Sequence, residues 1–98
     1  MSVFTQRLKY ARLAKGLSQE RLGVESGLDE MSASARMNRY EQGVRVPDVE
    51  LVQKIASVLD VPVAYFYSTD DDEAELLLAF HRLPQLTKKQ ILEYLRRL

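Results

Sequence analysis

The feature that most constrains the fold of this chain is the spacing of its apolar residues, which follows a helical period in one segment after another. Phe4, Leu8 and Ala11 recur at i, i+4 and i+7, and a stripe with similar spacing runs through residues 52–59. The alternation of apolar and polar residues that indicates a β-strand does not occur over any length. We therefore predict an all-α fold with no sheet.

Glycine, proline and capping residues divide the chain into helices. Ser18 and Asp48 are suited to cap helix N-termini, and a capping box is expected to start the last helix at Thr87. Glycines are expected to end the first three helices, Pro62 to separate the fourth from the fifth, and Pro84 to end the sixth. The predicted helices cover approximately residues 4–15, 19–26, 32–42, 49–59, 63–66, 70–83 and 88–98.

Length and composition favour a single small domain. The chain has 98 residues, enough for one modest core, and it has no cysteine, which suits a reducing cytoplasm and excludes disulfides and thiolate metal sites. No apolar run approaches the length of a signal peptide or a membrane span, so we expect a cytoplasmic protein without membrane contact.

The net charge is zero, but it is unevenly divided along the chain. Residues 1–47 hold eight Lys or Arg against five Asp or Glu, whereas residues 48–98 hold six against nine. Such a division suits a protein that presents one basic face to phosphates, although chance scatter of charge on a small domain is the simpler alternative.

The segment Ser32–Gly43 has two unlike faces when it is drawn as a helix. Its inward positions include Met37 and Tyr40, and Gly43 is suited to end it with a positive φ angle. Its outward side holds no acidic residue and combines small side chains with amide and guanidinium groups, which are the groups best suited to base edges. We predict a DNA-reading helix whose outward face consists of Ser34, Ala35, Asn38, Arg39 and Gln42.

The order of these motifs resembles the phage repressor and Cro family (XRE-like) of helix-turn-helix transcriptional regulators. The resemblance covers about residues 4–67. It rests on the run Gly16-Leu17-Ser18-Gln19, on Gly27, on Tyr40-Glu41-Gln42-Gly43 and on Pro47 with the apolar run after it. It implies a five-helix lambda-repressor-like DNA-binding domain over residues 1–68. Residues 69–98 would then be a two-helix C-terminal extension for packing or dimerisation within the same globular unit.

The resemblance also implies roles for individual residues. Gln19 would bind a DNA phosphate and brace the recognition helix, and Arg45 would contact a phosphate from the following loop. Arg12 would pair with Glu41 and orient the recognition helix. The base-reading positions would be Ser34, Ala35 and Arg39.

The sequence departs from the family spacing between Gly27 and Tyr40, where it carries about four extra residues. Either the turn before the recognition helix is longer, or the helix begins a turn earlier, near Asp29 or Glu30. Asn38, Arg39 and Gln42 are fixed relative to Tyr40 in both cases, whereas Ser34 and Ala35 depend on where the helix starts.

Several residues have a simpler interpretation beside a functional one. Arg36 lies at the border of the two helix faces and would make either a phosphate contact or a surface salt bridge. The Arg12–Glu41 pair could be a surface pair that contributes little to stability. The acidic run Asp70–Glu73 fits a helix N-terminus better than a metal site, and His81 has no partners for a zinc site or a catalytic triad. We expect no enzyme activity, no metal and no cofactor.

The C-terminal third has more apolar residues than one narrow helical stripe requires. Leu77 and Leu78 are adjacent and cannot point in the same direction, so a second chain would cover some of these residues while the helices also fold back on the core. We predict a repressor that binds a palindromic site in double-stranded DNA as a homodimer. The alternative is an adaptor or an antitoxin-like module that binds a partner protein through residues 70–98.

Overall fold

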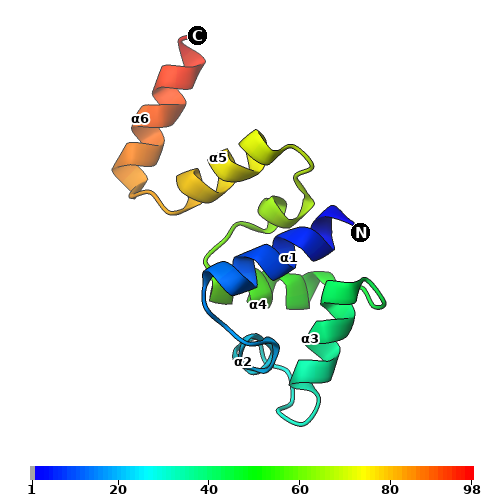
Figure 1. Cartoon of the computed structure of the whole chain (residues 1–98). Coiled ribbons are helices and arrows are strands. Elements are labelled where there is room, and N and C mark those ends of the chain that lie inside the picture. Colours follow the sequence, from blue (N-terminus) through cyan, green and yellow to red (C-terminus); the bar gives the residue numbers. More distant parts are fainter. Residues whose placement is uncertain (1) are drawn as a thin grey trace.

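The computed structural model describes residues 2–98, and all the regular structure in this range is helical. Six α-helices and one 3₁₀-helix follow one another without a strand (Figure 1). This confirms the predicted all-α fold. The elements are α1 (Val3–Ala14), α2 (Gln19–Glu25), α3 (Ala33–Gln42), α4 (Val49–Leu59), η1 (Val63–Tyr67), α5 (Asp71–His81) and α6 (Gln85–Arg96).

The first five elements enclose one apolar core. Each contributes at least one side chain that is fully shielded from solvent, because the apolar stripe of each helix faces the same centre. Phe66 of η1 closes this core and packs its ring against Phe4 of α1, with the ring centroids 5.5 Å apart. The largest fully buried apolar side chains are Phe66, Leu8, Leu22, Met37, Ile55, Leu59 and Val52.

Helices α2 and α3 approach each other unusually closely at Gly23. A Cβ atom built at Gly23 would lie 2.8 Å from Cβ of Ala33 and 3.1 Å from its carbonyl oxygen. The absence of a side chain at Gly23 therefore lets the first turn of α3 rest directly on α2. This contact fixes the position of α3 relative to the rest of the fold.

The extra residues before α3 form a longer turn, and the helix does not begin a turn earlier. Asp29 builds this turn, because its side chain accepts a hydrogen bond from the backbone N–H of Met31 at 3.1 Å and its carbonyl oxygen accepts one from Ser32 N at 3.0 Å. Helix α3 then starts at Ala33 and ends before Gly43, whose φ of 75° terminates it as predicted.

The predicted caps hold at two helix starts and fail at one. The side chain of Ser18 accepts a hydrogen bond from Arg21 N, and that of Asp48 accepts one from Leu51 N. The capping box predicted at Thr87 is wrong, because α6 begins at Gln85 after the extended residue Pro84 and Thr87 lies inside the helix. Proline has a fixed φ that favours the start of a helix. The helix therefore begins directly after Pro84 and not at the threonine.

Two arginines tie α5 to the core. At the N-terminal end of α5, the side chain of Arg7 donates to the carbonyl oxygen of Ser68 and to the carboxylate of Asp71. Just after its C-terminus, Arg82 donates to the carbonyl oxygen of Asp60 at 3.0 Å. The face of α5 between these anchors packs on the core through Ala74, which is 2% exposed.

Helix α6 leaves the end of α5 and points away from the other helices (Figure 1). None of its residues is buried, so the fold-back predicted for both C-terminal helices holds for α5 and is wrong for α6. The three-residue connection places the start of α6 beyond the end of α5, and from there α6 extends into solvent. The radius of gyration of 14.9 Å exceeds the roughly 13 Å of a compact domain of this size, as expected for a protruding helix.

Candidate nucleic-acid interface

The outward face of α3 presents the predicted polar residues together. Ser34, Ala35, Asn38, Arg39 and Gln42 are all exposed, whereas the inward positions of the same helix are buried. Its small side chains lie in the first turn and its amide and guanidinium groups follow. This face can approach a grooved surface closely and offer hydrogen-bond donors along its length.

A buried ion pair joins this helix to α1. Nη2 of Arg12 donates to Oε1 of Glu41 at 3.1 Å, and Nε donates to Oε2, so the guanidinium and carboxylate meet through two parallel bonds. The Glu41 side chain is 1% exposed, and Arg12 also donates to the carbonyl oxygen of Leu17 at 2.8 Å. The pair is therefore buried, and it links α1, the loop before α2, and α3.

Gln19, at the start of α2, contacts α3 with its side-chain amide. Its Nε2 lies 3.2 Å from both Oδ1 of Asn38 and Oε1 of Glu41. The structure thus places Gln19 between the orienting pair and the outward face, and its contact with Asn38 could not be inferred from sequence spacing. The side-chain oxygen of Asn38 accepts this hydrogen bond while the residue stays exposed.

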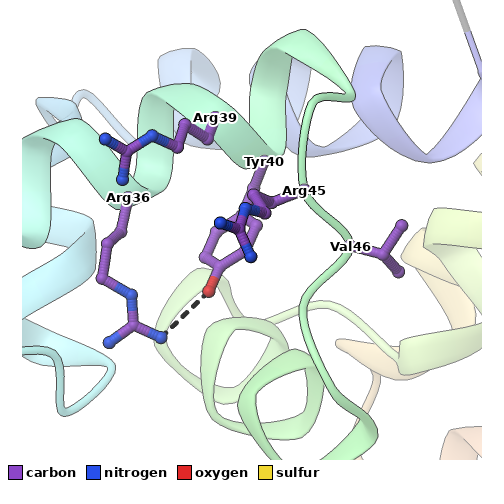
Figure 2. A pocket seen from close by; sticks show the side chains of 5 residues that line it. All are labelled: Arg36, Arg39, Tyr40, Arg45 and Val46. Carbon is purple, nitrogen blue, oxygen red and sulfur yellow. Dashed lines mark hydrogen bonds between the residues drawn. The ribbon is translucent and has the colours of Figure 1, made fainter.

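Three arginines line one hollow on the surface, two from α3 and one from the loop after it. Arg36, Arg39 and Arg45 line a hollow of about 290 Å³ together with Tyr40 and Val46 (Figure 2). No acidic side chain is among the residues that line it. A concave surface with this charge is suited to a phosphate group, which would accept hydrogen bonds from guanidinium donors.

Arg36 is fixed by a contact that the sequence analysis missed. Its Nη2 donates to the hydroxyl oxygen of Tyr40 at 3.0 Å, as the dashed line in Figure 2 marks. The predicted alternatives for Arg36 were a phosphate contact or a surface salt bridge. Within residues 2–98 its side chain is bonded to the phenol and forms no salt bridge, and the phosphate contact stays a prediction. The i, i+4 spacing of the two residues on one helix was the signal that could have revealed it.

Other clusters in the described part of the chain have structural roles. The side chain of Asp70 caps α5 by accepting a hydrogen bond from Glu73 N at 2.9 Å. His81 lies 3.4 Å from a carboxylate oxygen of Asp60 on the surface. Residues 2–98 contain no group of three or more His, Cys, Asp or Glu side chains arranged to hold a metal ion.

Among residues 2–98, no helix has both the length and the apolar character that crossing a membrane requires.

A braced helix with an outward polar face, packed against a short preceding helix in an all-α domain, defines the class of helix-turn-helix DNA-binding proteins. Comparison with known families agrees. Residues 8–66 match the helix-turn-helix family, and the chain therefore belongs to this family of transcriptional regulators.

Related proteins support the same assignment. Two proteins described as uncharacterized HTH-type transcriptional regulators, from Sinorhizobium medicae (strain WSM419) and Rhizobium meliloti (strain 1021), are each 31% identical over 61 residues. That alignment includes 62% of this chain and 41% of each relative, so the match spans less than half the length of these relatives. The crystal structure of the transcriptional regulator BswR is 42% identical with a TM-score of 0.89, and the match covers 100% of this chain and 95% of that one.

Proposed function

We propose that this protein is a transcriptional repressor that binds a palindromic operator as a homodimer. The observation that carries the proposal is the exposed, acid-free face of α3, which the buried Arg12–Glu41 pair holds in a single orientation. Two such helices in one dimer would enter successive major grooves about 34 Å apart. Occupied operators would block transcription in the cytoplasm.

Two sets of residues would divide the work of recognition. Asn38, Arg39 and Gln42, with Ser34 and Ala35 one to two turns earlier, are proposed to contact base edges. Phosphates would be bound from positions on either side of this face, which set the register of the protein on the duplex without reading sequence. The proposed phosphate contacts are Gln19, Arg36 and Arg45.

The geometry favours Arg39 over Arg36 as the arginine that reads a base. Arg39 is exposed and its side chain has no hydrogen-bond partner among residues 2–98, whereas Arg36 is half-buried and its side chain is bonded to Tyr40. A free guanidinium can form two parallel hydrogen bonds with guanine, and a tethered one is better placed for a phosphate at the groove edge.

Selection of bound sites from random DNA tests this function directly. A palindromic consensus is expected, with half-sites separated by about one helical turn. Arg39→Ala should weaken binding to the selected site by about 1–3 kcal/mol and relax discrimination at one position of each half-site. Lys89→Ala, which removes an exposed cation from α6, is the matched control and should leave the selected consensus unchanged.

If Arg39→Ala lost affinity equally for all sequences, or lost none, the result would contradict a base-reading role for Arg39. Recovery of no enriched sequence would contradict the proposed function. If a second protein also co-purified with the chain, the adaptor or antitoxin-like alternative would be favoured. The observation behind that alternative is α6, whose apolar residues are exposed in this structure.

A further inference from the structure

Helix α6 carries an apolar face that the described residues leave largely uncovered. Ile91, Leu95 and Leu98 recur at i, i+4 and i+7, which places them on one side of the helix. Leu95 is 48% exposed and Leu98 is 83% exposed. Leu86 is exposed too, but it lies on the opposite side of the helix, so it does not belong to this face.

Helix α5 has a second apolar face of its own. Ala74 and Leu78 face the core. On the other side of the helix lie Leu76, Phe80 and Leu83, which recur at i, i+4 and i+7. Leu76 is 58% exposed, and neither it nor Phe80 or Leu83 packs in the core. Phe80 and Leu83 are half-buried, and Nζ of Lys88 at the start of α6 lies 5.7 Å from the centroid of the Phe80 ring. The chain therefore has two partly exposed apolar helix faces, one on each side of the α5–α6 connection.

Within one chain the two helices touch near the connection, where Lys88 lies over Phe80, and they diverge beyond it. Only Arg82, Leu83 and Pro84 separate α5 from α6, and Arg82 is bonded to the carbonyl oxygen of Asp60. Pro84 is extended, with φ of −60° and ψ of 153°. In Figure 1 the two helices accordingly diverge from this point, with α6 pointing away from α5. Short connections of this kind favour exchange of an element between two copies over a tight hairpin.

We propose that two copies of this chain exchange α6, so that α6 of each copy lies antiparallel on the second apolar face of α5 of the other copy. The lengths match, because eleven residues of α5 and twelve of α6 correspond to about 16 and 18 Å of helix. The proposal rests on the homodimer of the proposed function and specifies which surfaces form it.

Charge complementarity identifies a second copy as the occupant. The first turn of α5 holds Asp72 and Glu73 beside Asp71, which is bonded to Arg7, whereas Arg96 lies in the last turn of α6 and Arg97 follows it. Antiparallel exchange brings these oppositely charged ends together at two symmetric places. A single chain supplies both the acidic and the basic end, so no other protein is needed to complete the interface.

Sedimentation equilibrium of the full chain tests the apolar part of this interface. Leu95→Glu places a carboxylate in the centre of the α6 face and should raise the dissociation constant of the dimer by about tenfold or more. Leu86→Glu makes the same change on the opposite side of α6 and should alter the constant by less than about twofold. Equal effects of the two variants, or a wild-type chain that is monomeric, would overturn the exchange.

Cross-linking tests the arrangement independently of stability, because the chain has no cysteine of its own. A Glu73→Cys chain is mixed with an Arg96→Cys chain and treated with a flexible bismaleimide. Exchange predicts a cross-linked dimer in the mixture and little product from Arg96→Cys alone. Efficient cross-linking of Arg96→Cys with itself would indicate α6 packing on α6, and a linkage formed only within a Glu73→Cys, Arg96→Cys double variant would indicate fold-back. Both results would overturn the proposal.

DNA binding separates this proposal from the proposed function. If Leu95→Glu dissociates the dimer, it should weaken binding to a palindrome but bind a single half-site as the wild type does. Cross-linked dimers of a chain that enriches no DNA sequence would support the exchange and contradict the repressor. A chain that selects a palindrome but shows no cross-link between position 73 and position 96 would support the repressor and contradict the exchange.

Discussion

Glu41 is a buried acidic residue whose side chain is only 1% exposed, so its negative charge is balanced by the guanidinium of Arg12 and not by solvent. We predict that Glu41→Gln lowers the free energy of unfolding by about 3–5 kcal/mol, since it leaves the guanidinium buried without a counter-charge. Urea denaturation measures this change. Glu25→Gln is the control, because the carboxylate of Glu25 lies 3.6 Å from Arg21 in an exposed pair, and it should change stability by less than about 0.5 kcal/mol.

An equal effect of both substitutions would contradict a structural role for the Arg12–Glu41 pair. Loss of this pair should affect DNA binding as well as the stability of the fold. Because it orients α3, a Glu41→Gln chain that stays folded should lose specific DNA binding more than non-specific binding, since only base contacts require the helix in one register.

Tyr65 is the residue whose titration should affect stability at high pH. Burial raises the pKa of the Tyr65 phenol above its ordinary value of 10.0, and the Arg7 guanidinium, whose Cζ lies 5.7 Å from the ring centroid, opposes part of this rise. In the unfolded chain the phenol loses its proton first, so the folded chain binds more protons and the free energy of unfolding falls as pH rises from about 10 towards the folded pKa.

Tyr65→Phe removes this titration, and its unfolding free energy should decline less steeply above pH 10 than that of the wild type. Parallel urea titrations at a series of pH values measure the difference. Tyr94→Phe is the control at an exposed tyrosine of α6. Identical pH profiles for the wild type and Tyr65→Phe would refute the prediction.

At the scale of elements, the crossing of α2 and α3 depends on a missing side chain. Gly23→Ala improves the intrinsic helix propensity of α2 by up to about 1 kcal/mol. It also places a Cβ atom 2.8 Å from that of Ala33, and such overpacking costs about 1–3 kcal/mol. We predict a net loss of stability and a lower thermal midpoint, which a circular dichroism melt measures.

The paired substitution Gly23→Ala, Ala33→Gly removes the closest of these contacts and should recover part of the loss. A Gly23→Ala variant that is more stable than the wild type would show that the helices can move apart freely. The same crossing holds α3 in its outward position, so a shift there should also weaken specific DNA binding.

At the scale of the whole molecule, the zero net charge hides a basic surface around α3. Arg36, Arg39 and Arg45 of one chain line a single hollow beside α3. Each phosphate contact made by a cation contributes about −0.9 to the slope of log affinity against log salt. Arg45→Ala should therefore reduce the magnitude of this slope by about two for a dimer.

Binding to a fixed operator across a salt series, measured by gel shift or fluorescence anisotropy, tests this prediction. Lys89→Ala removes a charge from α6 and should leave the slope unchanged, because α6 projects away from α3. A slope that does not respond to Arg45→Ala would place the phosphate contacts elsewhere on the surface.

The sequence by itself determined the helices, most of their ends and the two faces of α3. These features depend on short-range physics: Gly43 ends a helix because it accepts a φ of 75°, and Asp48 begins one because its carboxylate reaches the free N–H of Leu51. The inward and outward positions of α3 follow from the helical period alone. The resemblance to the repressor family added the Arg12–Glu41 pairing, which the structure confirms.

Only the tertiary structure decided how far the pair is buried, where the extra residues before α3 go, and what α6 contacts. Burial of Glu41 and the bond from Gln19 to Asn38 depend on segments that are distant in the sequence, so no local spacing encodes them. The direction of α6 depends on three connecting residues whose geometry the apolar pattern leaves open. An apolar stripe requires that something cover it, but it does not specify whether the cover comes from the same chain or from another.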